Sequence, residues 1–127
     1  GPVGRGATMK LAVNAYFGIQ VAALAEVVAM LSRSGFDSTA AFEAMAAMPI
    51  TSPALQGVAG LMARSAHAPL FPIDLVEKDF RYAVSAAEAA GVEPRLSAAA
   101  RDAYRAAQEA GYGSDNISGV AQLHAGR

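Results

Sequence analysis

The feature that most limits the fold is a long apolar segment near the start of the chain, from Leu11 to Leu31. Neither this segment nor the rest of the chain shows the alternation of polar and apolar residues that marks a half-buried strand. The segment is long enough for a membrane span. It contains Asn14, Gln20 and Glu26, however, and such side chains are costly in hydrocarbon. We therefore expect a helix over about 8–32 that is buried along much of its length in protein, not in a membrane.

Proline, glycine and capping residues divide the remaining chain into shorter helices. The expected helices cover about 38–48, a stretch starting at Pro53, about 73–90, about 94–110 and a short sixth helix capped by Asp115. Gly35, Gly91 and Gly111 are expected to end helices, and the loop lies at 66–72, where Pro69 and Pro72 interrupt regular structure. The sequence thus predicts an all-α fold of about six helices around a long buried first helix, in one domain over 1–127.

Charge and composition exclude several functional classes. Ten basic and eleven acidic residues leave a net charge of −1, so no excess positive charge is available for nucleic acid. The chain has no cysteine, and its two histidines, His67 and His124, lie far apart in the sequence, so we expect no metal site. A secretory signal is disfavoured because the apolar run continues without a clear break, and we expect a cytoplasmic protein.

Lys10 is the most informative polar residue. It is one of two lysines in a chain that otherwise uses arginine, and a lysine can exchange a proton where an arginine cannot. Asn14 lies one turn further along the same helical face, with Cβ atoms about 5–6 Å apart. A lone lysine in a first helical turn is usually only solvated. The glycines before it, Gly4 and Gly6, and the polar pair within an apolar helix favour a specific site.

The string Gly4-x-Gly6-x-x-x-Lys10-x-x-x-Asn14 resembles the signature of the β-hydroxyacid dehydrogenases, the family of 3-hydroxyisobutyrate dehydrogenase-like enzymes. A second segment, Phe71-x-x-x-Leu-x-x-Lys78-Asp79, is similar to another helix of that family. A weaker likeness is the glycine-rich turn at 111–118. Taken without the resemblance, residues 77–81 would be a solvated helical face whose ion pairs contribute a few tenths of a kcal/mol.

The resemblance implies roles for the matched residues. Lys10 corresponds to the family's catalytic lysine, and Asn14 to the asparagine that orients substrate and lysine. Lys78 matches a contact to the nicotinamide cofactor, NAD or NADP. Phe71 and Asp79 fall at positions that line or support the substrate pocket. The implied substrate is a small hydroxy acid or semialdehyde.

The resemblance also implies a fold and an assembly. The chain looks like the C-terminal helical domain of 6-phosphogluconate dehydrogenase-like enzymes, which often dimerise through this domain. No strand followed by G-x-G-x-x-G occurs, so we expect the N-terminal dinucleotide-binding (Rossmann) domain to be absent from this chain and the fragment alone to be inactive.

Two questions stay open at the level of sequence. One is the choice between NAD and NADP and the identity of the acid, since both depend on residues outside the matched segments. The other is the functional class, because the chain is also compatible with a non-catalytic helical oligomerisation or interaction module. In that module Lys10 and Lys78 would be surface residues that lie apart.

Overall fold

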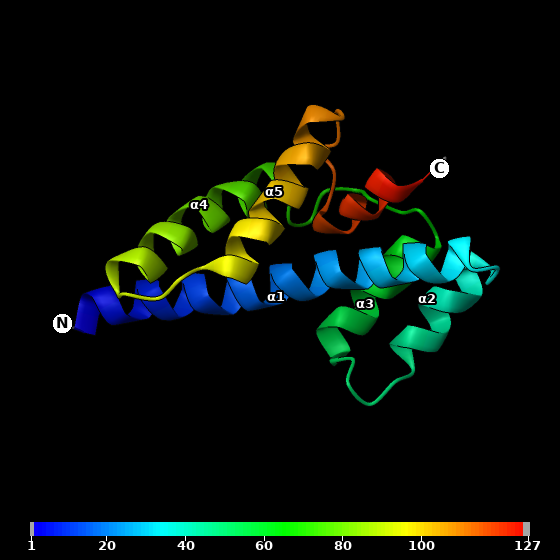
Figure 1. The fold of residues 1–127 in the computed structure, drawn as a ribbon, viewed down its shortest axis with the longest axis horizontal. Helices are drawn as coiled ribbons and strands as arrows, with labels where there is room; N and C mark the ends of the chain where they lie inside the picture. Colours follow the sequence, from blue (N-terminus) through cyan, green and yellow to red (C-terminus); the bar gives the residue numbers. More distant parts are fainter. Residues whose placement is uncertain (1, 126–127) are drawn as a thin grey trace.

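The computed structural model describes residues 2–125, with side chains from Gly4 onward. It is all-α in this range, which confirms the predicted fold class (Figure 1). The elements are α1 (Pro2–Arg33), α2 (Ser38–Ala46), α3 (Pro53–Ala63), α4 (Ile73–Ala89), α5 (Arg95–Glu109) and the 3₁₀ helix η1 (Ile117–His124). The only extended pairing among these residues is an isolated bridge between Pro72 and Asn116.

Local chemistry sets most helix ends. The Asp37 carboxylate accepts a hydrogen bond from the Ala40 amide at 3.0 Å, and the Ser52 hydroxyl accepts one from the Leu55 amide at 3.2 Å. Each is the N-cap of the helix that follows. Gly35, Gly91 and Gly111 have φ of 108°, 81° and 96°, the left-handed conformation in which glycine commonly ends a helix.

The last element differs from the expected one. It is a 3₁₀ helix whose N-cap residue is Asn116, and no side chain caps it. The prediction that Asp115 caps it is therefore wrong. The Asp115 carboxylate instead accepts a hydrogen bond from the Gln122 side-chain amide at 2.8 Å.

All other helices pack against α1, but they divide along its length. In Figure 1, α4 and α5 lie over the half of α1 that begins at the N-terminus, and α2, α3 and η1 surround the other half. The two long helices α4 and α5 also pack on each other, as do α2 and α3. The molecule therefore has two helical groups along one long helix, and η1, which packs on α3 and also on α4 and α5, connects them as well.

The expectation that α1 is buried along much of its length is wrong for its first part. Fully buried positions occur from Gly18 to Val28, whereas 4–10 is exposed throughout. Met9, Val13 and Tyr16 share one face of α1 and are 65%, 57% and 69% exposed. The reason is that α4 and α5 cover one side of this part, and no other described helix covers the rest.

The apolar character of α1 is compatible with more than one environment. By length and mean hydropathy (1.6), Gly4–Arg33 meets the requirements of a membrane span, as core helices and signal sequences also do. Residues Val21, Leu24, Ala25 and Val28 belong to the core of the domain. The absence of membrane association remains a prediction.

Gly18 sets the distance between α1 and α4. A Cβ atom at Gly18 would lie 2.6 Å from the Phe80 ring, closer than non-bonded carbon atoms approach. Phe80 in turn stacks on Tyr104 of α5, with ring centroids 5.6 Å apart and planes at 18°. The Tyr104 hydroxyl donates a 2.7 Å hydrogen bond to the Gly18 carbonyl. Burial raises the pKa of this phenol well above its usual range, so it stays protonated as a donor.

Glu77 corrects the view of residues 77–81 as a solvated face. Its side chain is 8% exposed, accepts a hydrogen bond from Arg101 of α5 at 3.0 Å and forms an ion pair with Arg81 at 3.2 Å. A carboxylate at this depth requires such partners. Glu77 therefore holds α4 against α5. Other polar residues of α4, such as Lys78, stay accessible to solvent.

Candidate functional site

An open cavity of about 390 Å³ lies where α1 and α4 run side by side. It is lined by Ala7, Lys10, Leu11 and Asn14 from α1 and by Asp79 and Tyr82 from α4. We call it the Lys10 cavity. The α1 residues follow the three- and four-residue spacing of a helical face, as do the two α4 residues, so each helix contributes one stripe.

Asn14 and Asp79 join the two stripes. The Asn14 side-chain amide donates a hydrogen bond to the Asp79 carboxylate, with Nδ2 and Oδ2 3.3 Å apart. Both residues are half-buried. This bond uses one of the two amide hydrogens and leaves the Asn14 carbonyl oxygen to accept or the second hydrogen to be donated.

Lys10 lies at the same cavity but is exposed. Its side chain is therefore accessible to solvent beside the hydrogen-bonded Asn14–Asp79 pair. The apolar side chains of Leu11 and Tyr82 form the rest of the wall. Such a surface can hold a small molecule with one polar end, with an N–H donor and a proton source close together.

Two of the sequence-predicted site residues lie outside this cavity. Phe71 is half-buried and packs against the core before α4 begins. Lys78 precedes Asp79 on α4 and is exposed. Neither lines the Lys10 cavity. The structure thus brings Lys10, Asn14 and Asp79 together, and the roles of Phe71 and Lys78 remain predictions.

Tyr82 is a cavity residue that the sequence reasoning did not assign to the site. It is 55% exposed and lies one turn after Asp79 on the same face of α4. The helical spacing from Asp79 was a signal that could have identified it.

A buried polar network holds the Phe71 segment. Asn116 is 2% exposed, and its side-chain oxygen accepts from the amides of Leu70 and Phe71 at 3.3 and 2.9 Å. Its amide donates to the Ser118 hydroxyl at 3.0 Å, and that hydroxyl also bonds His67 Nδ1 at 2.9 Å. No local sequence pattern indicated this network, because it forms between the 66–72 loop and η1.

His67 is the titratable member of that network. Burial lowers its pKa from the ordinary value of 6.5, and the nearby Asp115 carboxylate opposes the shift more weakly. The imidazole is therefore neutral at neutral pH. Across the described part of the chain, no cluster of three or more histidine, aspartate or glutamate side chains has the arrangement of a metal site.

Residues 4–124 match the family model described as the NAD-binding domain of NADP-dependent 3-hydroxyisobutyrate dehydrogenase. The chain belongs to this family. The predicted resemblance to 3-hydroxyisobutyrate dehydrogenase-like enzymes is thereby confirmed.

Two plant relatives cover 94% of the chain. Glyoxylate/succinic semialdehyde reductase 1 of Arabidopsis thaliana is 32% identical over 120 residues, and the chloroplastic reductase 2 of the same plant is 31% identical. The matched regions are 42% and 34% of those proteins, so the chain spans less than half of either relative.

A solved structure described as 3-hydroxyisobutyrate dehydrogenase from Salmonella typhimurium has the same fold. It superimposes with a TM-score of 0.86 and 23% identity, over 93% of this chain and 41% of that one. At this identity the likeness establishes the fold of the 3-hydroxyisobutyrate dehydrogenase family for this chain.

Proposed function

We propose that this chain is the helical, catalytic-lysine half of an NAD(P)-dependent enzyme that interconverts a small hydroxy acid and its aldehyde or ketone. The observation that carries the proposal is the placement of Lys10, Asn14 and Asp79 around one cavity between α1 and α4. Family membership supports the reaction class.

Lys10 is the proton-transfer group in this proposal. In the direction of reduction, its ammonium group donates a proton to the oxygen of the substrate carbonyl, and in oxidation the amine takes the hydroxyl proton back. When bound, the nicotinamide cofactor supplies or accepts the hydride at the adjacent carbon.

Asn14 and Asp79 orient the reacting oxygen. The Asp79 carboxylate holds the Asn14 amide in one rotamer, and the remaining amide hydrogen is then directed at a substrate oxygen. Leu11 and Tyr82 provide an apolar surface for the substrate carbon chain. The exposed Lys78 amine is suited to bind a phosphate of the cofactor. Phe71 is suited to support the part of the site that holds the substrate.

The dinucleotide is bound mainly by a second domain in this proposal. The described helices leave Lys10 exposed on one side, and a covering domain would complete and dry the site. The chain alone is then inactive. The names of the two plant relatives favour a substrate of the glyoxylate or succinic semialdehyde kind, a small carbonyl compound that carries a carboxylate.

The test is an activity assay on the longer protein that encodes this chain, compared with the chain alone. We expect oxidation of NADPH or NADH with glyoxylate or succinic semialdehyde, or reduction of NAD(P) with 3-hydroxyisobutyrate, in the longer protein alone. An upstream reading frame that lacks a strand, a glycine-rich turn and a helix would contradict the proposal. Turnover by the isolated chain would contradict the proposal that a second domain is required for activity.

A non-catalytic oligomerisation role remains the alternative, and self-association is also compatible with an enzyme. The exposed face of Met9, Val13 and Tyr16 is the observation that favours association into a homodimer or a higher homo-oligomer. Light scattering at increasing concentration tests it. A monomer at the highest concentration would count against it.

A further inference from the structure

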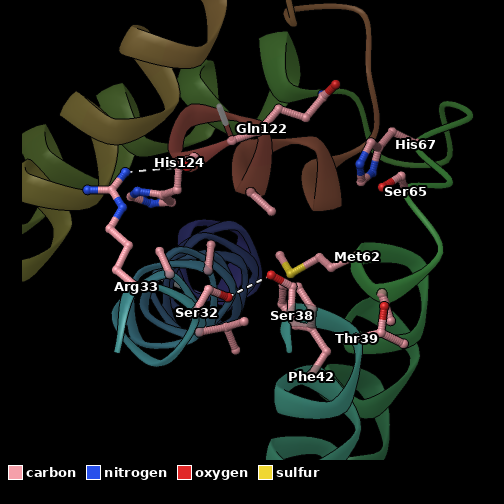
Figure 2. A pocket seen from close by; sticks show the side chains of 16 residues that line it. Ser32, Arg33, Ser38, Thr39, Phe42, Met62, Ser65, His67, Gln122 and His124 are labelled. Atoms are coloured by element: carbon pink, nitrogen blue, oxygen red, sulfur yellow. Dashed lines mark hydrogen bonds between the residues drawn. The ribbon is translucent and has the colours of Figure 1, made fainter. Parts of the chain in front are cut away.

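A second and larger cavity, of about 630 Å³, lies at the opposite end of α1. Four elements enclose it, namely the last turns of α1, the start of α2, the end of α3 with the residues after it, and η1 (Figure 2). We call it the Arg33 cavity. Arg33 is about 35 Å from Lys10 along the axis of α1, so a molecule bound there does not touch the Lys10 cavity.

Small side chains keep this space open. Five of the lining residues are alanines, Ala25, Ala29, Ala63, Ala121 and Ala125. Longer apolar side chains at these positions would fill the gap between the four elements. The volume lies within the range of small-molecule sites.

The lining combines apolar and polar side chains. Val28, Phe42 and Met62 belong to the core and present buried hydrocarbon. The polar lining groups are distributed around the space: Arg33 and His124 lie at one edge, whereas Thr39, Ser65 and His67 lie near Met62 (Figure 2). Figure 2 shows Arg33 and His124 together at one edge and Met62 and Phe42 across the space from them.

The described lining of this cavity carries one arginine, Arg33, and no carboxylate. The guanidinium has five donors, and within residues 4–125 it makes one hydrogen bond, a long one of 3.4 Å to the His124 carbonyl. Two carboxylates lie just outside the lining: Asp37, which precedes Ser38 and accepts from the Ala40 amide, and Asp115, which accepts from the side-chain amide of the lining residue Gln122.

We propose that the Arg33 cavity binds a monocarboxylate with a short aliphatic chain. The carboxylate pairs with the Arg33 guanidinium, which can donate two parallel hydrogen bonds to it, and the hydrocarbon chain lies over Val28, Phe42 and Met62. The Ser32 and Ser38 hydroxyls, which bond each other at 2.6 Å between α1 and α2, lie on the wall of the site. This site is independent of the reaction at Lys10.

The experiment is a calorimetric titration of the protein with hexanoate, 1-hexanol and hexylammonium, which share a chain and differ in the head group. We expect hexanoate to bind with a Kd of about 1 mM or tighter, and the other two at least about tenfold more weakly. Equal affinity for hexanol would show an apolar cavity without anion recognition and would overturn the proposal. Failure of hexanoate to bind at 10 mM, a concentration on the order of ten times that Kd, would also overturn it.

Variants locate the site. Arg33→Gln and the cavity-filling Ala29→Leu are each expected to weaken hexanoate about tenfold or more, whereas Arg95→Gln, on the exposed start of α5, is the matched control. Lys10→Ala is expected to leave the affinity unchanged. Loss of binding in Lys10→Ala alone would assign the anion to the Lys10 cavity and contradict the proposal. A chain that sediments as a dimer and excludes hexanoate would overturn the proposal, because a second copy and not a carboxylate would then occupy this cavity.

Discussion

The two ends of α1 have similar apolar sequences and very different surroundings. Around Val21–Val28 one face of the helix is fully buried by its neighbours and contributes to the core of the domain, while Ala23 and Glu26 stay exposed. Around Met9–Tyr16 it is covered on one side, and its other apolar side chains are exposed. Lys10, Asn14 and their cavity belong to this less covered end.

The difference shows how one helix can serve both stability and chemistry. Residues that contact a substrate must be accessible, whereas residues that hold the helix in the domain are buried in its core. Gly18 is at the boundary, where the Phe80 ring of α4 packs on the α1 backbone and the Tyr104 hydroxyl bonds the Gly18 carbonyl. We therefore infer that the enclosed end stabilises the domain and that the open end provides the reactive side chains.

The largest expected effect is the loss of activity on replacing Lys10. In the longer protein, Lys10→Ala should lower kcat/KM by about 10²- to 10⁴-fold, the range for loss of a general acid or base. Thermal stability should be unchanged, because Lys10 is exposed. Steady-state assays and thermal denaturation measure both, with Arg95→Gln as the control. A variant that lost stability and activity together would show that this end of α1 is structural.

A smaller effect is expected at the boundary between the two ends. Gly18→Ala should destabilise the protein by about 1–3 kcal/mol, because its Cβ atom would meet the Phe80 ring. Gly57→Ala in α3 is the matched control, since nothing lies within 4 Å of a Cβ atom there. That variant should gain up to about 1 kcal/mol. Urea denaturation measures both, and equal effects would refute the close contact of α1 with α4.

A third effect tests the link between the stripes of the Lys10 cavity. Asn14→Ala and Asp79→Ala should each lower kcat/KM, and the double variant should lose less than the product of the two losses. The coupling free energy between the two substitutions should be about 1 kcal/mol, the usual contribution of one hydrogen bond. Fully multiplicative losses in the kinetic double-mutant cycle would show that the two residues act separately.

The smallest expected effect is a pH dependence at the enclosed end. Because the folded state lowers the pKa of His67, the unfolded chain binds the proton first as the pH falls through 6.5. The free energy of unfolding should therefore decrease below this pH and level off below the folded pKa. In urea denaturation at several pH values, His67→Gln should lose part of this pH dependence of the unfolding free energy, and His124→Gln should retain it. An unchanged pH dependence in His67→Gln would contradict the assignment.

The sequence predicted the features that depend on local spacing. Glycine and proline positions predicted most helix ends, although α1 begins at Pro2 and not at about residue 8, and the four-residue interval placed Lys10 and Asn14 on one face. Asp79 entered through the family resemblance, since no spacing rule connects residues 65 positions apart. The close contact at Gly18, the burial of Glu77 between two arginines and the Asn116 network depend on how helices meet. Such tertiary contacts have no local signal, and this also explains why the burial of α1 was overestimated.

The most direct test of the central claim is chemical rescue of Lys10→Ala in the longer protein. The claim is that the Lys10 amine transfers the proton at the cavity shared with Asn14 and Asp79. The account predicts that methylamine or ethylamine restores part of the lost turnover, in proportion to its concentration, and that the same amines do not stimulate the unmodified enzyme. If no small amine restores turnover although the variant is folded and binds the cofactor, the proton comes from another group and the account is wrong.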